Sequence, residues 1–147
     1  MTFTKEDGLI QRVALLNQAI TIHVNQLFDS PHINSTNYFY LLKLLDYPEI
    51  TQSNFSALVK LNQSTITRAI NTLVKNGYID KLSSDDKRSA LLKLTPLGKE
   101  TALSIKEKVE ELNQYLLPDQ SDSQMVQLLE EMEQRLDKLD QKNPEKN

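Results

Sequence analysis

The chain has 147 residues, with 17 Lys or Arg, 20 Asp or Glu, no Cys and a net charge of −3 at pH 7. This length fits one domain with its own core, and the lack of Cys excludes disulfides, thiolate metal sites and cysteine-based redox sensing. Only three glycines are present, so neither a dinucleotide-binding nor a P-loop motif can be written on the sequence. The first thirty residues contain neither a signal-peptide apolar run nor a membrane span, which predicts a cytoplasmic protein.

The charge is unevenly distributed along the chain. Residues 51–99 carry eight Lys or Arg and three Asp or Glu, whereas the remainder carries nine and 17. A basic middle between acidic ends is typical of a localised phosphate-binding surface.

The N-terminal residues predict an amphipathic helix over residues 4–28. Thr4 and Asp7 form a capping box, a usual signal for a helix start. Apolar residues then recur at spacings of three and four, in a stripe wider than one intramolecular contact needs. His23 lies on this helix and is expected to be partly buried.

A second helix is predicted up to about Asp46, with Asn34 or Ser35 as its N-cap. Its expected inward face is apolar and aromatic: Tyr38, Leu41, Leu42 and Leu45. An aromatic ligand pocket at Tyr38 is one interpretation of this face, and helical packing explains the residue equally well.

Two further helices, over about 51–60 and 62–75, are predicted to be joined by a tight turn, with Thr51 and Asn62 as N-caps. Gly77 follows the second of them, at a position that requires positive φ. A type I′ hairpin turn at Asn76 and Gly77 is the alternative.

The helix over residues 62–75 has two contrasting faces. Its core face is expected to contain Ile66, Ile70 and Leu73. At 100° per residue, the side chains that point away from this face are polar or basic: Ser64, Thr65, Thr67, Arg68, Asn71 and Lys75. Small hydroxyls allow a helix to enter a DNA major groove, Arg reads guanine and Asn pairs with adenine. A merely solvated face is the alternative, but the surrounding elements favour DNA contact.

A charged hairpin is predicted next, with strands at about 78–82 and 89–94. Lys87 and Arg88 in its loop are expected to reach DNA phosphate or a narrow minor groove. Asp86 is expected to hold the loop by bonding its amides or the Arg88 guanidinium. Considered alone, the loop is equally well explained as an ordinary solvated turn.

The C-terminal third predicts two long helices. Thr95 and Pro96 form the start of the first, as cap and first helical residue, and Pro118 ends it. A capping box at Ser121 and Gln124 precedes apolar residues at heptad-like spacings. Together with the N-terminal stripe, these helices offer more apolar surface than one small domain can cover, which predicts self-association. An intramolecular core is the alternative.

These motifs resemble, in order, those of the MarR family of bacterial winged-helix transcriptional regulators. The matching segments are Thr51–Ser53, Asn62–Ile70, Asn76–Ile79, the wing motif Asp86–Ser89 and the exit Leu94–Gly98. The sequence departs from the family at Asn54, where Glu is frequent, and at Asp80–Lys81, where Glu-Arg is more usual.

The resemblance implies a mainly α fold with a small β-hairpin wing, in which residues 1–147 form one MarR-like domain. It implies a winged-helix DNA-binding lobe over 33–97, with the helices of 4–29 and 96–140 forming the dimerisation lobe. It also implies a homodimer that binds a pseudo-palindromic operator in double-stranded DNA. Many such proteins repress transcription and release DNA when a small aromatic effector binds.

Other functions are weighed against this interpretation. With His23 and His32 as the only histidines, no metal site is expected, and neither a cofactor nor a catalytic residue is expected. Tyr38 and His23 are the candidates for effector binding. The alternative function, motivated by the net acidity, is a winged-helix adaptor or antirepressor that binds protein and not DNA.

Overall fold

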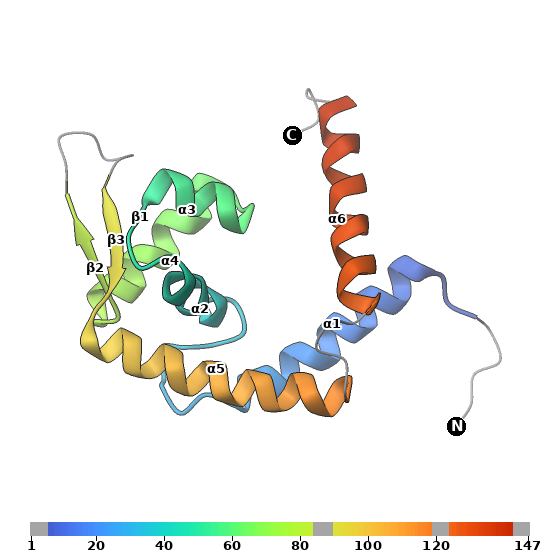
Figure 1. Cartoon of the computed structure of the whole chain (residues 1–147), viewed down its shortest axis with the longest axis horizontal. Coiled ribbons are helices and arrows are strands. Elements are labelled where there is room, and N and C mark those ends of the chain that lie inside the picture. Colours follow the sequence, from blue (N-terminus) through green and yellow to red (C-terminus); the bar gives the residue numbers. More distant parts are fainter. Residues whose placement is uncertain (1–5, 84–89, 119–123, 143–147) are drawn as a thin grey trace. The chain divides into compact units, whose positions relative to one another are not determined.

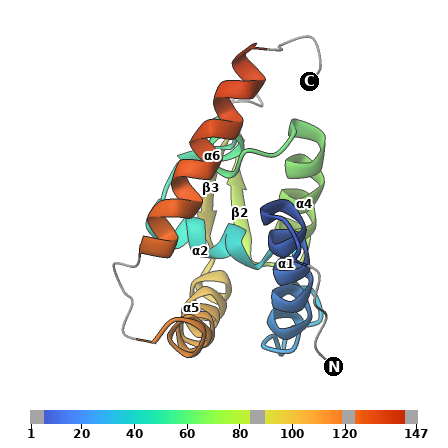
Figure 2. The same cartoon turned by 90° about the vertical axis from the view of Figure 1, so that its right-hand side faces the viewer.

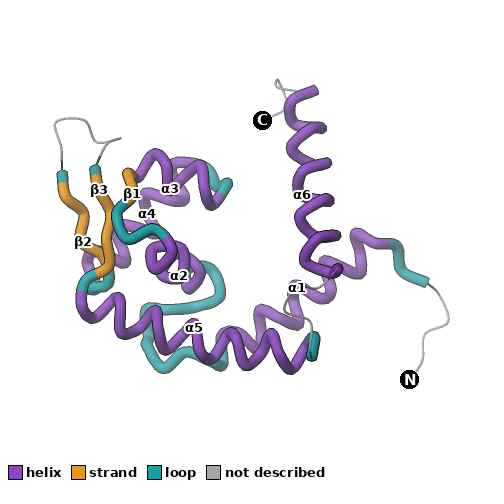
Figure 3. The backbone as a smooth tube through the Cα atoms, in the orientation of Figure 1, coloured by secondary structure: helices purple, strands orange, loops and turns teal. Residues whose placement is uncertain are grey.

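The computed structural model describes residues 6–83, 90–118 and 124–142. The elements run along the chain as follows (Figures 1 and 3): α1 (Leu9–Asn25), α2 (Tyr38–Asp46), β1 (Ile50–Thr51), α3 (Gln52–Val59), α4 (Gln63–Lys75), β2 (Ile79–Leu82), β3 (Leu91–Leu94), α5 (Pro96–Leu116) and α6 (Gln124–Lys142). The chain divides into two compact units, Met1–Glu110 and Glu111–Asn147. The predicted fold class, mainly α with a small β wing, is confirmed.

The sheet has three antiparallel strands in the order β1-β3-β2. The hairpin of β2 and β3 agrees with the prediction. The strand β1 was not predicted, because a two-residue strand is too short to show any periodicity. Ile50 pairs with Leu92 and Thr51 with Leu91, so the start of α3 is tied to the strand that returns from the wing. α2 contacts β3 and α4 contacts β2, which packs both helices on the sheet (Figure 2).

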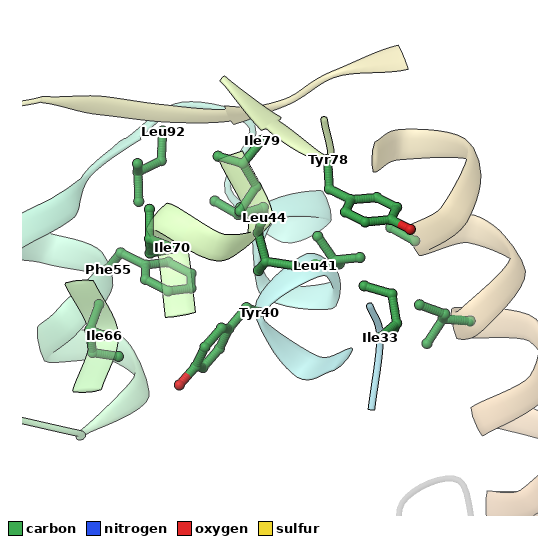
Figure 4. Close-up of a cluster of buried hydrophobic side chains, with 13 residues drawn as sticks. Ile33, Tyr40, Leu41, Leu44, Phe55, Ile66, Ile70, Tyr78, Ile79 and Leu92 are labelled. Atoms are coloured by element: carbon green, nitrogen blue, oxygen red, sulfur yellow. The ribbon is translucent and has the colours of Figure 1, made fainter. Parts of the chain in front are cut away.

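The core of the first unit is shared by α2, α3, α4, the sheet and the first half of α5 (Figure 4). Its fully buried large side chains are Tyr40, Leu41, Leu44, Phe55, Ile66, Ile70, Leu73, Ile79 and Leu92. Full burial of each apolar side chain contributes about 1.5–3 kcal/mol relative to exposure. Because α4 supplies three of these residues, its orientation is fixed by the core on one whole side.

The first helix is shorter than predicted. It begins at Leu9 after Gly8, whose backbone is extended and whose position offers no side-chain cap. Asp7 precedes the helix, and its partner in the expected capping box, Thr4, lies outside the described residues. The helix ends at Asn25 because its last turn tightens: the amide of Leu27 donates to the carbonyl of Val24 at 3.0 Å.

The predicted cap of α2 is wrong. Asn37, not Asn34 or Ser35, occupies the N-cap position, and its side chain makes no cap bond. The asparagines instead bond locally: Asn37 Oδ1 accepts from the amide of Asn34, and Asn34 Oδ1 accepts from the amide of Thr36, both at 2.9 Å. Such turns compete with capping for the same side-chain oxygens.

The inward face of α2 differs in part from the prediction, which is correct for Leu41. Tyr40, Leu41 and Leu44 are its buried residues, whereas Tyr38, Leu42 and Leu45 are only partly buried against the core cluster. The helix packs on more than one side, so a single apolar stripe could not identify its deepest residues.

Hydrogen bonds close the end of α4 and the start of α5. Gly77 has φ +84°, its amide donates to the Val74 carbonyl at 3.1 Å, and the Tyr78 amide donates to the Leu73 carbonyl at 2.9 Å. This is the Schellman ending of a helix, so the helix-cap interpretation of Gly77 is correct. Thr95 Oγ1 caps α5 by accepting from the Gly98 amide at 2.9 Å.

The second unit consists mainly of α6, in which no residue is buried. Its exposed large apolar residues are Met125, Val126, Leu128, Leu129, Leu136 and Leu139. The expected capping box at Ser121 lies outside the described residues. No helix in the described ranges is long and apolar enough to cross a membrane.

Candidate nucleic-acid interface

Helix α4 separates its apolar and polar residues sharply. Ile66, Ile70 and Leu73 are buried, while the polar side chains predicted to face away from them are exposed or half-buried. Four of these side chains are exposed: Ser64, Arg68, Asn71 and Lys75. The other two, Thr65 and Thr67, are half-buried. Because this outer face carries hydroxyl, amide and cationic groups without a carboxylate, it can bond to phosphates and base edges and does not repel them.

Helices α3 and α4 both begin at a capped N-terminus. Thr51 Oγ1 accepts from the Asn54 amide at 3.1 Å, and Asn62 Oδ1 accepts from the Thr65 amide at 2.9 Å. Ser64 Oγ also donates to Asn62 Oδ1 at 2.9 Å. The Ser64 hydroxyl proton therefore supports the cap, which leaves this side chain its acceptor lone pairs for an external partner.

The turn between α3 and α4 contains a strained residue. Lys60 adopts the left-handed conformation, with φ 56° and ψ 33°, and its amide donates to the Ser56 carbonyl. A residue with a Cβ pays about 1–2 kcal/mol for this conformation. The strain permits the tight turn that sets α4 against α3.

Arg68 is the one arginine on the outer face of α4. Its Nε donates to the carbonyl of Ser64 at 3.5 Å, so the side chain follows the helix toward its N-terminus. A shallow hollow of about 350 Å³ lies beside it, lined by Asn34, Thr36, Asn37, Thr65, Arg68, Ala69 and Thr72. The exposed guanidinium retains the four N–H donors of its two Nη atoms, in a planar fork that matches guanine or phosphate.

The tip of the wing, with Asp86, Lys87 and Arg88, lies outside the described residues. Its two strands are described, and Asp80 of β2 lies directly opposite Lys93 of β3. Oppositely charged residues across two strands stabilise the pairing modestly. This pair places Asp80, one of the departures from the family pattern, next to a cation that the sequence motifs did not single out.

Gln52 is a further residue that the sequence patterns missed. It opens α3, where a polar residue after the cap is expected to be exposed, yet it is only 7% exposed. Its Nε2 donates to Thr67 Oγ1 on α4 at 3.2 Å. Only the long-range packing of α3 on α4 reveals this contact, so no local signal could have found it.

The two effector candidates have different environments. His23 is exposed on α1, which corrects the expectation that it is partly buried; Val24 beside it is the buried residue of that helix. Tyr38 is half-buried, and burial raises the pKa of its phenol. Its ring lies 5.5 Å from that of Phe28.

Phe28 lines a cavity of about 240 Å³ within the first unit, and Tyr38 does not line it. Other lining residues include Leu27, Ser30, Ile33, Leu97 and Ile105. Lys108 closes one side, where its Nζ donates to the Leu27 carbonyl and to Asp29 Oδ2, both at 3.0 Å. The cavity thus combines apolar walls with one cation, Lys108, and two carboxylates, Asp29 and Glu100.

No metal-binding group of three His, Asp or Glu residues occurs among residues 6–83, 90–118 and 124–142. Comparison with curated protein sequences gives no match. The sequence profile of the MarR family matches residues 33–90, the range that contains α2, α3, α4 and β2.

Solved structures with the same fold extend over nearly the whole chain. A MarR protein from Peptoclostridium difficile is 25% identical, with a TM-score of 0.76 over 92% of both chains. The PcaV transcriptional regulator from Streptomyces coelicolor, in complex with its natural ligand, is 26% identical, with a TM-score of 0.73 over 92% of this chain and 98% of that one.

A mutant MarR from E. coli complexed with operator DNA has the same fold. It is 23% identical, with a TM-score of 0.69 over 87% of this chain and 92% of that one. Profile, fold and the order of the elements agree. Residues 33–90 therefore match the MarR family, and the chain has the winged helix-turn-helix fold of the MarR structures.

Proposed function

We propose that this regulator binds double-stranded DNA sequence-specifically as a homodimer, at a pseudo-palindromic operator, and represses transcription from it. The observation that carries the proposal is the outer face of α4, where Arg68, Asn71 and three hydroxyl residues stand opposite a fully buried core face. A rigidly held helix with such a face is the usual reader of a major groove. The operator-bound MarR from E. coli supports this role.

Base reading is assigned to the α4 residues in the proposal. Arg68 and Asn71 supply bidentate contacts, while Ser64, Thr65 and Thr67 supply hydroxyls to base edges or phosphate. Lys87 and Arg88 of the wing would contact flanking phosphate or minor groove, with Asp86 holding the loop. Residues 33–97 form the DNA-binding lobe in this scheme.

Dimerisation is assigned to the helices of residues 4–29 and 96–140. The supporting observation is their uncovered apolar surface: on α1, Ile10 is 84% exposed and Leu9 61% exposed, and α6 buries nothing. Contiguous exposed apolar surface of this kind marks an interaction site on a stable protein. A second copy of the chain would cover both helices and set the distance between two α4 helices.

An effector site is proposed at the cavity lined by Phe28. Its apolar walls suit a small aromatic molecule, and PcaV, which has a natural ligand, shares the fold. Tyr38 would act through its ring contact with Phe28. His23 is the weaker candidate because it is exposed and is not among the residues that line the cavity.

Selection of DNA fragments by the purified protein tests the proposal. We expect enrichment of a two-fold symmetric site with half-sites about 10 bp apart, and affinity that falls steeply with salt because phosphate contacts release counterions. If no fragment is enriched at low salt, the winged-helix adaptor, which binds protein instead of DNA, becomes the better explanation.

The same assay tests the wing. Arg88→Ala should weaken binding to every sequence and reduce the slope of log affinity against log salt by about one unit. An unchanged slope would remove Arg88 from the phosphate contacts and leave the α4 assignments standing.

A further inference from the structure

We propose that Gln52 is a positioning residue that sets the hydrogen-bonding direction of Thr67, and through it the base preference of α4. The proposal rests on the DNA-binding function proposed above. It concerns a residue of α3 that lies behind the reading face, not on it.

The backbone of Gln52 is anchored to the sheet. Its amide donates to the carbonyl of Ala90 at 2.9 Å, just before β3, and Thr51 pairs with Leu91. With Phe55 and Ser56, Gln52 forms the buried face of α3. The side chain therefore leaves from a fixed point, directed at α4.

The side-chain amide is only half satisfied. Nε2 donates to Thr67 Oγ1 at 3.2 Å, whereas Oε1 is buried and has no hydrogen-bond partner among the described residues. A buried carbonyl without a partner is destabilising, and an apolar side chain of this length would avoid the cost. A polar group kept at such a cost needs a role other than stability.

The hydrogen bond between the two side chains has a defined direction. Nε2 carries only N–H donors, so Thr67 Oγ1 must be the acceptor in this bond. The hydrogen of the Thr67 hydroxyl is therefore not used by Gln52.

Thr67 and Thr72, both on α4, differ in how their hydroxyl hydrogens are used. Thr72 Oγ1 donates to the carbonyl of Arg68 at 3.0 Å, so its proton is bound within the helix. Thr67 makes no hydrogen bond through its side chain other than the one with Gln52, among the described residues. Its hydroxyl proton remains available to a partner outside the protein.

The bond from Gln52 occupies one of the two lone pairs of Thr67 Oγ1 and polarises its O–H, which makes the hydroxyl a better donor than acceptor. A hydroxyl in this state favours bases that present acceptors in the major groove. These are the N7 and O6 of guanine, the N7 of adenine and the O4 of thymine, whereas cytosine presents only an amino donor. Thr67 in this state therefore favours any of these three bases over cytosine on the contacted strand. Gln52 selects the base without touching DNA.

The test compares base preference between variants by selection from a randomised operator library, with thermal unfolding measured on each variant. Gln52→Met keeps the length and apolar stem but has no amide, and Thr67→Val keeps the shape but has no hydroxyl. We expect both to lose about fivefold of the discrimination against cytosine at the same position of each half-site. The double variant should lose no more than either single variant.

Folding supplies an independent readout. Because Gln52→Met also removes the unmatched carbonyl, its melting temperature should equal or exceed that of the wild type, whereas a merely structural glutamine would lower it. Gln52→Leu repeats the measurement with a second apolar side chain. Ser56→Ala is the matched control, since the Ser56 hydroxyl is also buried on α3 but bonds the backbone carbonyl of Gln52, at 3.0 Å, and not Thr67.

Three results would overturn the proposal: wild-type preference retained by Gln52→Met and Gln52→Leu, an equal loss on every sequence, or preference retained by Thr67→Val. Loss of preference in Ser56→Ala would also overturn it, because any disturbance of α3 would then suffice. If the wild type itself enriches no sequence, the DNA-binding function fails, and that outcome is distinct from the other four.

Discussion

The α2–α4 part of the first unit and the helix α6 of the second unit use apolar residues in opposite ways. In the first, Leu41, Phe55, Ile66, Ile70 and Leu73 are completely buried within one chain. In the second, none of the apolar residues of α6 is buried. The difference teaches that the candidate reading face of α4 is held in place by its own chain, whereas the apolar residues of α6 are left exposed by theirs.

The largest effect on stability should come from removing a core side chain of the α2–α4 part. Phe55 is 0% exposed, and Phe55→Ala should lower the free energy of unfolding by about 3–5 kcal/mol, because it removes burial and leaves a cavity. Urea unfolding followed by circular dichroism measures the change. Leu139→Ala on α6, studied at a dilution where the chain is monomeric, should cost under about 0.5 kcal/mol; a comparable loss there would erase the contrast.

The stability of the proposed dimer should depend more on α6 than on the α2–α4 part. Leu136 is 60% exposed on α6, and Leu136→Glu should weaken the dimer by about 3 kcal/mol, which is more than a hundredfold, because a carboxylate would be buried in an apolar interface. Sedimentation equilibrium measures the change. Gln127→Glu adds the same charge away from the heptad-like residues and should leave the dimer constant nearly unchanged. Equal effects of both changes would show that the assigned seam is wrong.

A smaller effect is expected at the reading face. Arg68→Ala should cost about 1–3 kcal/mol at one base pair of each half-site and relax the preference there, because a bidentate contact is lost. Arg135→Ala on α6 removes the same charge from an exposed site and should leave base preference unchanged. Uniform loss over all sequences in Arg68→Ala would reassign this residue to phosphate.

The smallest effect concerns the turn between α3 and α4. Lys60 holds φ 56°, so Lys60→Gly should raise the free energy of unfolding by about 0.5–1 kcal/mol through relief of strain. Lys60→Ala keeps a Cβ and should give no gain. A gain in both variants would mean that the lysine head group, and not the backbone, is the source of the strain.

Features with a local cause could be predicted from the sequence. The caps at Thr51 and Asn62 and the positive φ of Gly77 depend on residues within one helical turn. The amphipathic split of α4 follows from its periodicity alone. These are the elements that position the candidate reading face.

Features that depend on distant or competing contacts could not be predicted. The strand β1 exists only because Ile50 and Thr51 find partners in β3, about forty residues later in the chain. The start of α2 shifted because Asn34 and Asn37 bond to nearby backbone groups instead of to the helix terminus. Burial of Gln52 arises from the packing of α3 on α4, which no local pattern contains.

The close approach at Gly98 has a consequence for communication within the first unit. A Cβ on Gly98 would lie 1.9 Å from the carbonyl oxygen of Tyr78, so the first turn of α5 rests directly on the backbone that leaves α4. The Tyr78 hydroxyl bonds Ser30, a residue that lines the cavity beside α5. Tyr78 therefore contacts the cavity wall, the start of α5 and the end of α4. A displacement of any one of these three segments would be transmitted to the other two through this residue.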